Sequence, residues 1–214
     1  MKSIVVSVAS LLAFLALTSC ATKSPTAPID DSLTLTTFDL KTGDKLLHLK
    51  KESSVEKIDT LNVTYVTGVS GSQVVTFDNL SAYQMRNRFI DLASNSGYVT
   101  IAKFPSVRGD TVARSLDSLV ISGEVKQIYR AVLISTTPDT TVTTAAGTFR
   151  CGVFTRVSLP TIVDGTAPIA QISTYVISTR YGMVTLSVDS WAGASTDGSP
   201  FEQQQTELIK IIRK

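Results

Sequence analysis

Short stretches in which apolar and polar residues alternate recur along most of the chain. Residues 59–66 show the pattern clearly, with Leu61, Val63 and Tyr65 on one face. A period of two is the signature of a strand with one buried face. Thr and Val are frequent in these stretches, and turn-forming residues separate them. We predict strands at 33–40, 45–50, 59–66, 73–77, 97–104, 116–121, 128–135, 148–159, 170–179, 183–191 and 206–213, the last of which also fits a helix.

Residues 78–96 fit two structures. Their apolar positions match one face of a helix that begins at Asp78 or Asn79. They also match a hairpin in which residues 90–92 face residues 99–101 across a Ser-Asn-Ser-Gly turn at 94–97. We favour the hairpin, with a short helix before it at most.

About ten strands with little helix predict a mainly β fold. Strongly twisted sheets of that size seldom stay open. We therefore expect a curved antiparallel sheet, in the form of a half-barrel, a barrel or a sandwich, with at most one or two short helices. A concave face would offer a binding surface, with Val132, Ile134, Tyr175 and Ile177 as possible lining. In a closed fold the same residues would be core.

The N-terminus has the pattern of a secretory signal. One basic residue, Lys2, precedes an apolar run at 4–17 that only two serines interrupt. As a helix this run is about 21 Å long, whereas a bilayer core is about 30 Å thick. The run is therefore too short for a stable membrane span, and it fits an export signal.

Leu17-Thr18-Ser19-Cys20 follows the apolar run and resembles the lipobox of bacterial lipoproteins. The resemblance implies that a diacylglyceryl group alkylates the Cys20 thiol and that a signal peptidase then cuts before it. Residues 1–19 are then the signal peptide, and the acyl chains on Cys20 anchor the mature protein in a membrane. The alternative is an ordinary cleaved signal followed by a chance cysteine. Ala21 fits the default of the enterobacterial sorting rule, which implies an outer-membrane location facing the periplasm.

Residues 20–32 contain the lipidated cysteine and a flexible tether. The tether carries Pro, Thr, Ser and Asp with almost no apolar side chains. A flexible chain of this length has a root-mean-square span of about 20 Å. We expect it to leave the domain near the membrane without pressing the domain onto it. Residues 33–214 then form a single β-rich domain.

Composition narrows the class of protein. The chain has 214 residues and is 43% hydrophobic, which suits one folded domain and excludes a disordered chain. A net charge of +2 gives no electrostatic case for nucleic acid. With Cys20 lipidated, one cysteine remains, so a disulfide scaffold is excluded, and a single histidine excludes a His-rich metal site.

The candidate reactive residues lack partners in the sequence. Alternation places Cys151 on an apolar strand face, where a thiol stays protonated and inert. His48 is the one conceivable base, but no third residue completes a catalytic group with it, and a metal site needs three or four ligands. We expect no catalytic residue, no metal and no cofactor. An enzyme would instead bring together several of Asp59, Asp78, Asp117, Glu124 and His48.

Two further patterns involve arginine. Arg108-Gly109-Asp110 resembles an integrin-binding tripeptide, although Gly-Asp more simply makes a turn. The second pattern is a possible basic patch, for which a solvated sheet face is the simpler interpretation. Its members are Arg86, Arg88, Arg108, Arg114 and Arg130.

One passage carries a fold resemblance. Residues 143–151 read TTAAGTFRC, and YVIS at 175–178 and YGMV at 181–184 follow. Over residues 140–190 the chain resembles uncharacterised periplasmic proteins whose curved antiparallel sheets are similar to the half-barrels of lipoprotein carriers. The motif is structural: 145–147 makes a compact turn into a buried strand, and Gly182 permits a reversal that needs a positive φ.

These observations predict a lipid-anchored envelope lipoprotein that is not an enzyme. Its partners would be the membrane, through Cys20, and an apolar ligand or a protein, but no nucleic acid. The alternative is a structural or envelope-assembly lipoprotein without a ligand.

Overall fold

The computed structural model describes residues 33–94, 97–121, 124–163, 169–192, 200 and 202–214. The signal peptide expected at 1–19, and Cys20 with the tether at 20–32, lie outside the described residues and stay predictions. Residues 31–214 form one compact unit. No helix that could cross a bilayer occurs among the described residues.

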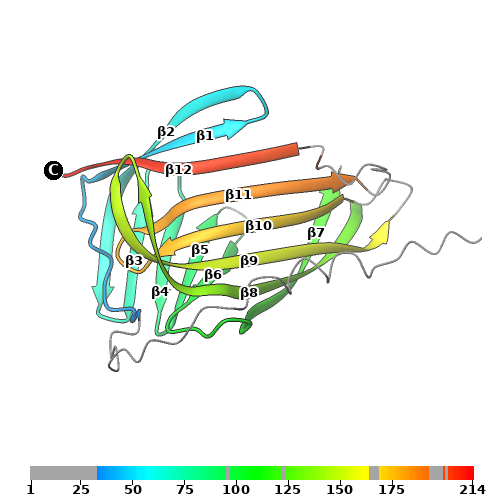
Figure 1. Ribbon diagram of the computed structural model, residues 1–214, viewed down its shortest axis with the longest axis horizontal. Helices are drawn as coiled ribbons and strands as arrows, with labels where there is room; N and C mark the ends of the chain where they lie inside the picture. The colour runs from blue at the N-terminus through cyan, green and yellow to red at the C-terminus, as the bar shows by residue number, and fades with distance from the viewer. Residues whose placement is uncertain (1–32, 95–96, 122–123, 164–168, 193–199, 201) are drawn as a thin grey trace, which may run out of the picture. The chain divides into compact units, whose positions relative to one another are not determined.

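The predicted mainly β fold is confirmed. Every regular element in the described ranges is a strand, and all strand pairs are antiparallel (Figure 1). The strands are β1 (Lys45–Glu52), β2 (Val55–Val69), β3 (Ser72–Phe77), β4 (Ala82–Arg86), β5 (Phe89–Ser94), β6 (Gly97–Lys103), β7 (Thr111–Ile121), β8 (Glu124–Thr144), β9 (Gly147–Val163), β10 (Ile169–Ser178), β11 (Gly182–Ala192) and β12 (Glu202–Ile212).

The strands form one 12-stranded sheet in the order β6-β5-β4-β3-β2-β1-β12-β11-β10-β9-β8-β7. Neighbours in the chain are neighbours in the sheet, except that β12 pairs with β1 and joins the first half to the second. The two edge strands, β6 and β7, contact each other without forming a ladder in the described residues. The sheet is therefore a nearly closed barrel with a seam between β6 and β7.

Strand β2 makes the sheet fold over. Its first half, as far as Asn62, pairs with β1, and its second half, from Val63, pairs with β3. The register shifts between Val63 and Tyr65, and such an irregularity bends a strand. Figure 1 shows the result, with β3–β6 crossing behind β9–β12.

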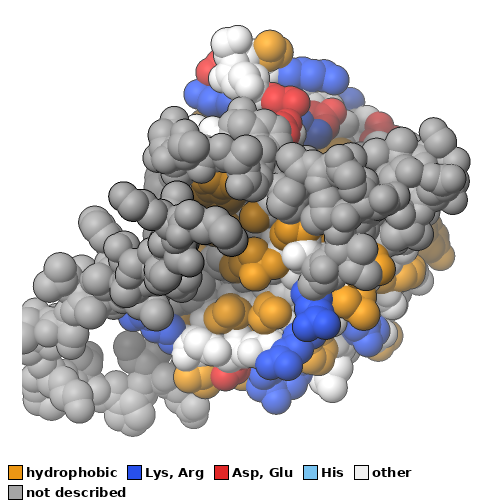
Figure 2. Space-filling model, turned by 90° about the vertical axis from the view of Figure 1, so that its right-hand side faces the viewer, with side chains coloured by type: hydrophobic (Ala, Val, Ile, Leu, Met, Phe, Trp, Pro, Cys, Tyr) orange, Lys and Arg blue, Asp and Glu red, His pale blue; other side chains and the backbone are white. Residues whose placement is uncertain are grey.

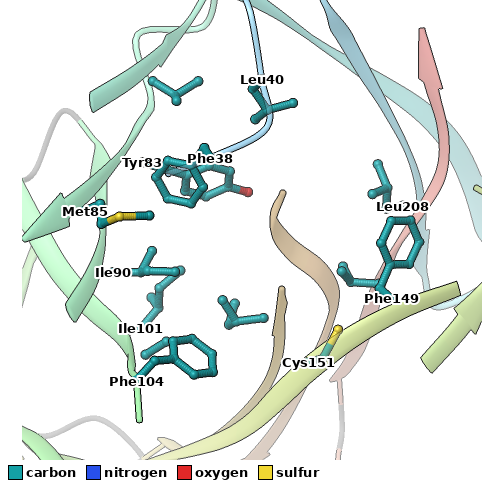
Figure 3. Close-up of a cluster of buried hydrophobic side chains, with 14 of the residues drawn as sticks. Phe38, Leu40, Tyr83, Met85, Ile90, Ile101, Phe104, Phe149, Cys151 and Leu208 are labelled. Carbon is teal, nitrogen blue, oxygen red and sulfur yellow. The ribbon is translucent and has the colours of Figure 1, made fainter. Parts of the chain in front are cut away.

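The core lies between the two halves of the sheet. Figure 3 shows Tyr83, Met85 and Ile90 of one half facing Phe149 and Leu208 of the other. Edge-to-face aromatic pairs add to this packing. These pairs are Phe77–Tyr83, with ring centroids 5.2 Å apart, and Phe104–Phe154, at 5.4 Å.

The prediction of a strand at 33–40 is wrong. This segment has no regular structure, yet Leu33, Phe38 and Leu40 are buried in the core (Figure 3). The Phe38 amide donates a hydrogen bond to the side-chain oxygen of Gln73. The alternating pattern correctly indicated which side chains are buried. The segment is not a strand, however, because the Phe38 amide bonds to a side-chain oxygen and not to the backbone of a neighbouring strand.

For the described part of 78–96, the hairpin prediction is confirmed. Among these residues there is no helix, and β4, β5 and β6 form successive antiparallel pairs. The expected turn at 94–97 is confirmed by the pairing of Ser94 with Gly97. Ile90 pairs with Ala102 and not with Ile101, because the register shifts between Ile90 and Asp91. The final run, within β12, is a strand.

Candidate functional site

Cys151 lies on β9 in the core and is fully buried, as predicted. Burial raises the pKa of its thiol to about 12. The thiol is therefore protonated at neutral pH and is a poor nucleophile.

His48 lies on β1 and is buried, with 2% of its surface exposed. Desolvation lowers the pKa of its imidazole, and a hydrogen bond to the Met183 carbonyl opposes that effect only in part. Its Nε2 has no hydrogen-bond partner among the described residues. The ring is buried and neutral because residue 48 falls on the core face of β1. Neither ring nitrogen bonds to Cys151.

Two of the acidic residues that an enzyme would bring together, Asp59 and Asp78, have different partners. Asp59 lies opposite His48 but forms an ion pair with Lys50 at 2.6 Å, which lowers the pKa of its carboxyl. Asp78 accepts hydrogen bonds from the backbone and side chain of Asn62 on the surface. The side chains of Asp117 and Glu124 lie outside the description. Among the described residues, no three His, Cys, Asp or Glu side chains are grouped as metal ligands.

Residues 108–110 form the turn that the sequence favoured. Gly109 has a φ of 89° and donates its amide to the Ser135 carbonyl at 2.7 Å. The Asp110 carboxylate accepts hydrogen bonds from the Val107 amide and from Lys103. These contacts fasten the connection between β6 and β7 to β8.

The two motifs linked by resemblance meet at one pocket of about 530 Å³, which we call the motif pocket. The rings of Phe149 and Tyr181 stack edge to face at 5.5 Å. Arg150 pairs with Asp139 at 2.6 Å, outside the pocket lining. The pocket is lined by Leu33, Thr34, Ala146, Gly147, Thr148, Phe149, Arg150, Ser178, Thr179, Arg180, Tyr181 and Ile211.

Gly182 explains why the second motif needs a glycine. Its φ is 77°, as the sequence predicted, and a Cβ there would clash with the ring of Tyr83. Arg180, in the same turn, pairs with Asp39 at 3.0 Å. Both arginines of the motif pocket are thus neutralised by aspartates, so this pocket has a structural explanation.

A second site lies at the seam of the barrel, and we call it the seam site. Its inner part is a cavity of about 190 Å³ between β6 and strands β7, β8 and β9. An open groove of about 460 Å³ adjoins it, since the two share Arg114, Ser115 and Ala131. The cavity is lined by Tyr98, Val99, Thr100, Ala113, Arg114, Ser115, Ala131, Leu133 and Arg156, and the groove adds Leu116, Arg130 and Val132.

The seam site combines apolar walls with positive charge. Val99, Ala113 and Leu133 give the cavity its apolar surface. Arg156 donates a hydrogen bond to the Ser115 hydroxyl at 3.2 Å. No Asp or Glu lines either part of the site. Figure 2, which faces the end of the sheet at the right of Figure 1, shows hydrophobic side chains in a hollow with Lys and Arg side chains below it.

The four residues expected to line a concave binding face do not lie on one surface. Tyr175 and Ile177 lie on the core side of β10, where Ile177 is fully buried. Val132 and Ile134 alternate with the buried Ala131 and Leu133, so they lie on the opposite side of the sheet. The prediction that these four residues line one surface is therefore wrong. Successive residues of a strand point to opposite sides of the sheet, and the residues chosen on β8 and on β10 point to different sides.

The five arginines that the sequence suggested as a basic patch also do not lie together. Arg86 pairs with Asp91 at 2.7 Å, Arg88 donates to the Pro105 carbonyl, and residue 108 belongs to the turn described above. Only Arg114 and Arg130 line a common site. The sequence did not reveal the seam site, since its walls come from four strands. The absence of acidic residues at alternate positions of 114–118 and 128–132 was the available signal.

No family model and no curated protein sequence matches the chain. Two solved structures share its fold. A proposed lipoprotein of Parabacteroides distasonis ATCC 8503 superposes with a TM-score of 0.58 at 12% identity, over 84% of this chain and 99% of that chain. A proposed exported protein of Bacteroides fragilis NCTC 9343, described as having a YmcC-like fold, gives 0.56 at 12% identity, over 84% and 100%.

Proposed function

We propose that this protein is a lipid-anchored lipoprotein of the bacterial envelope whose β domain binds an apolar ligand at the seam site. Acyl groups on Cys20 hold it in the outer membrane, facing the periplasm. The domain carries out no catalysis and needs no cofactor. The carrying observation is a groove with mainly apolar walls at the barrel edge, which adjoins a cavity of mixed polarity between β6 and strands β7, β8 and β9.

The lipoprotein part of the proposal has two supports. The lipobox-like sequence ends at Cys20 after an apolar run of signal-peptide length. Independently, the domain has the fold of a proposed lipoprotein and of a proposed exported protein. An envelope location is the one setting that suits both observations.

The seam site suits an apolar ligand better than the motif pocket does. Hydroxyls and paired arginines dominate the motif pocket, whereas Leu116, Ala131 and Val132 give the groove of the seam site a mainly apolar surface. A cavity of about 150 Å³ is large enough for a benzene-sized group. The seam cavity therefore has room for the end of an alkyl chain or for a ring, with the rest of the ligand in the groove.

A structural role without a ligand is the competing function. It is favoured by the segment at 33–40, because Phe38 and Leu40 fill the concave face that a carrier would leave open. Under this alternative the seam cavity is a packing defect at the barrel edge, and it stays empty.

Native mass spectrometry of the full chain purified from membranes separates the two functions. We expect a co-purifying lipid-sized mass on the wild-type protein. Ala113→Leu, which fills the seam cavity, should abolish that mass. Ala146→Leu is the matched control, because it makes the same change in the motif pocket and should leave the mass in place. Bare wild-type protein, or loss of the ligand in the control variant alone, would overturn the seam site.

A further inference from the structure

The outward side of β7, β8 and β9 carries an unusual combination of residues, which we call the outer patch. It consists of Leu159 together with Arg114, Leu116, Arg130 and Val132, which also line the groove of the seam site. Arg130 of β8 lies directly opposite Leu116 of β7 and Leu159 of β9, and Arg114 lies opposite Val132. Side chains at directly opposite positions of a ladder are in contact range, so the five residues form one continuous surface.

The two leucines of the outer patch are strongly exposed. Leu116 has 73% of its surface accessible and Leu159 has 53%. A single exposed leucine is ordinary. Two of them on either side of one arginine, beside the half-buried Val132, form an apolar patch that water does not favour, and such patches mark interaction surfaces.

The outer patch carries two positive charges and no acidic residue. Arg114 and Arg130 are exposed, and neither forms an ion pair or a hydrogen bond with a described residue. Among the described side chains, the positions around them on the same side of the sheet are Ile128, Ile134, Thr155 and Val157, none of them acidic.

We propose that the outer patch docks on an anionic phospholipid bilayer, as a second membrane contact beside the lipid anchor. Exposed leucines enter the boundary between headgroups and acyl chains, while guanidinium groups pair with lipid phosphates. The residues between Cys20 and Leu33 extend to about 40 Å at most, so the anchor would hold the domain within that distance of the membrane. The domain then lies against the membrane, which differs from the sequence expectation of a domain that hangs free.

A fluorescent label on an introduced thiol tests this docking directly. Leu116→Cys offers a selective site, because Cys151 is buried with a raised thiol pKa and Cys20 is proposed to be acylated. The full-length variant carries an environment-sensitive dye and is reconstituted into phosphatidylcholine vesicles with or without phosphatidylglycerol. Mass spectrometry of the same sample reports acylation, so a failed anchor is distinguishable from a failed docking.

We expect a blue shift of the dye only with phosphatidylglycerol, reversed by high salt because surface charges are then screened. Arg114→Gln with Arg130→Gln should remove the shift. Near an anionic surface each basic residue changes binding about fivefold, so the pair should weaken it about 30-fold. A dye at Val69→Cys, an equally exposed position at the end of β2, is the control and should not respond.

Equal responses at the two labelled positions would overturn the proposal, and so would a shift that persists without the two arginines. A dye response to an added soluble protein fraction but to neither vesicle would assign the outer patch to a protein partner and would also contradict it.

Discussion

Single residues in this protein show how burial changes the chemistry of a side chain. Cys151 and His48 carry the two side chains that enzymes most often use as nucleophile and base. Both lie on the core faces of their strands, and desolvation holds each in its neutral form. The sequence predicted the burial of Cys151 because its neighbours alternate cleanly, but it did not predict that of His48.

His48 should make stability depend on pH. Its pKa is lowered in the folded state, whereas the unfolded chain takes up a proton near pH 6.5. The unfolded state therefore binds more protons below that pH, and the free energy of unfolding falls as the pH decreases towards the folded pKa, below which the effect levels off. Urea unfolding between pH 7 and pH 5 measures this loss.

His48→Leu should remove that pH dependence. The chain has a single histidine, so no other imidazole contributes in this interval. A wild-type protein with flat stability from pH 7 to pH 5, or a variant with the same slope, would contradict a buried neutral His48.

Gly182 gives a prediction about backbone strain. Gly182→Ala places a Cβ at a positive φ and against the Tyr83 ring, so we expect it to lower the free energy of unfolding by about 2–4 kcal/mol. Gly71→Ala is the matched control, because its φ of 75° is similar but no atom lies within 4 Å of the added Cβ. The control should lose only about 1 kcal/mol. Equal losses in denaturant unfolding would exclude the contact with Tyr83.

At the scale of elements, strands form where the alternating pattern predicts them, but several are longer than the predicted ranges. Residues 128–135 were predicted as one strand and 148–159 as the next; β8 and β9 extend to Glu124–Thr144 and Gly147–Val163. The additional residues include many threonines, which have high strand propensity but no marked alternation of polarity. They become strand because a neighbouring ladder supplies their hydrogen-bond partners.

The segment at 33–40 is held in place by core packing and by hydrogen bonds outside any strand ladder. Phe38 is buried among the core residues and tilts against Tyr83 with ring centroids 5.9 Å apart. Phe38→Ala should therefore lower the free energy of unfolding by about 3–5 kcal/mol. Thr37→Ala, at an exposed neighbouring position, should have little effect. If both variants unfold at the same denaturant concentration, the segment does not belong to the folded core.

For the whole molecule, the central prediction concerns the proposed anchor. Cys20→Ser removes the thiol that would carry the acyl groups, and we expect the protein to move from the membrane pellet to the soluble fraction at high salt. High salt is needed because the outer patch would otherwise retain some protein through its arginines. Cys151→Ser is the control for thiol chemistry and should stay in the pellet. An unchanged distribution of Cys20→Ser would remove the anchor.

The sequence by itself determined a β-rich domain of alternating strands, and it predicts an export signal with a lipobox-like end before that domain. These properties are local, because periodicity and short motifs are read from neighbouring residues. Only the tertiary structure decided that 33–40 fills the core, that β12 joins β1, and that β6 meets β7 at a seam. Those features depend on which strands are adjacent, and adjacency follows from the packing of residues far apart in the chain.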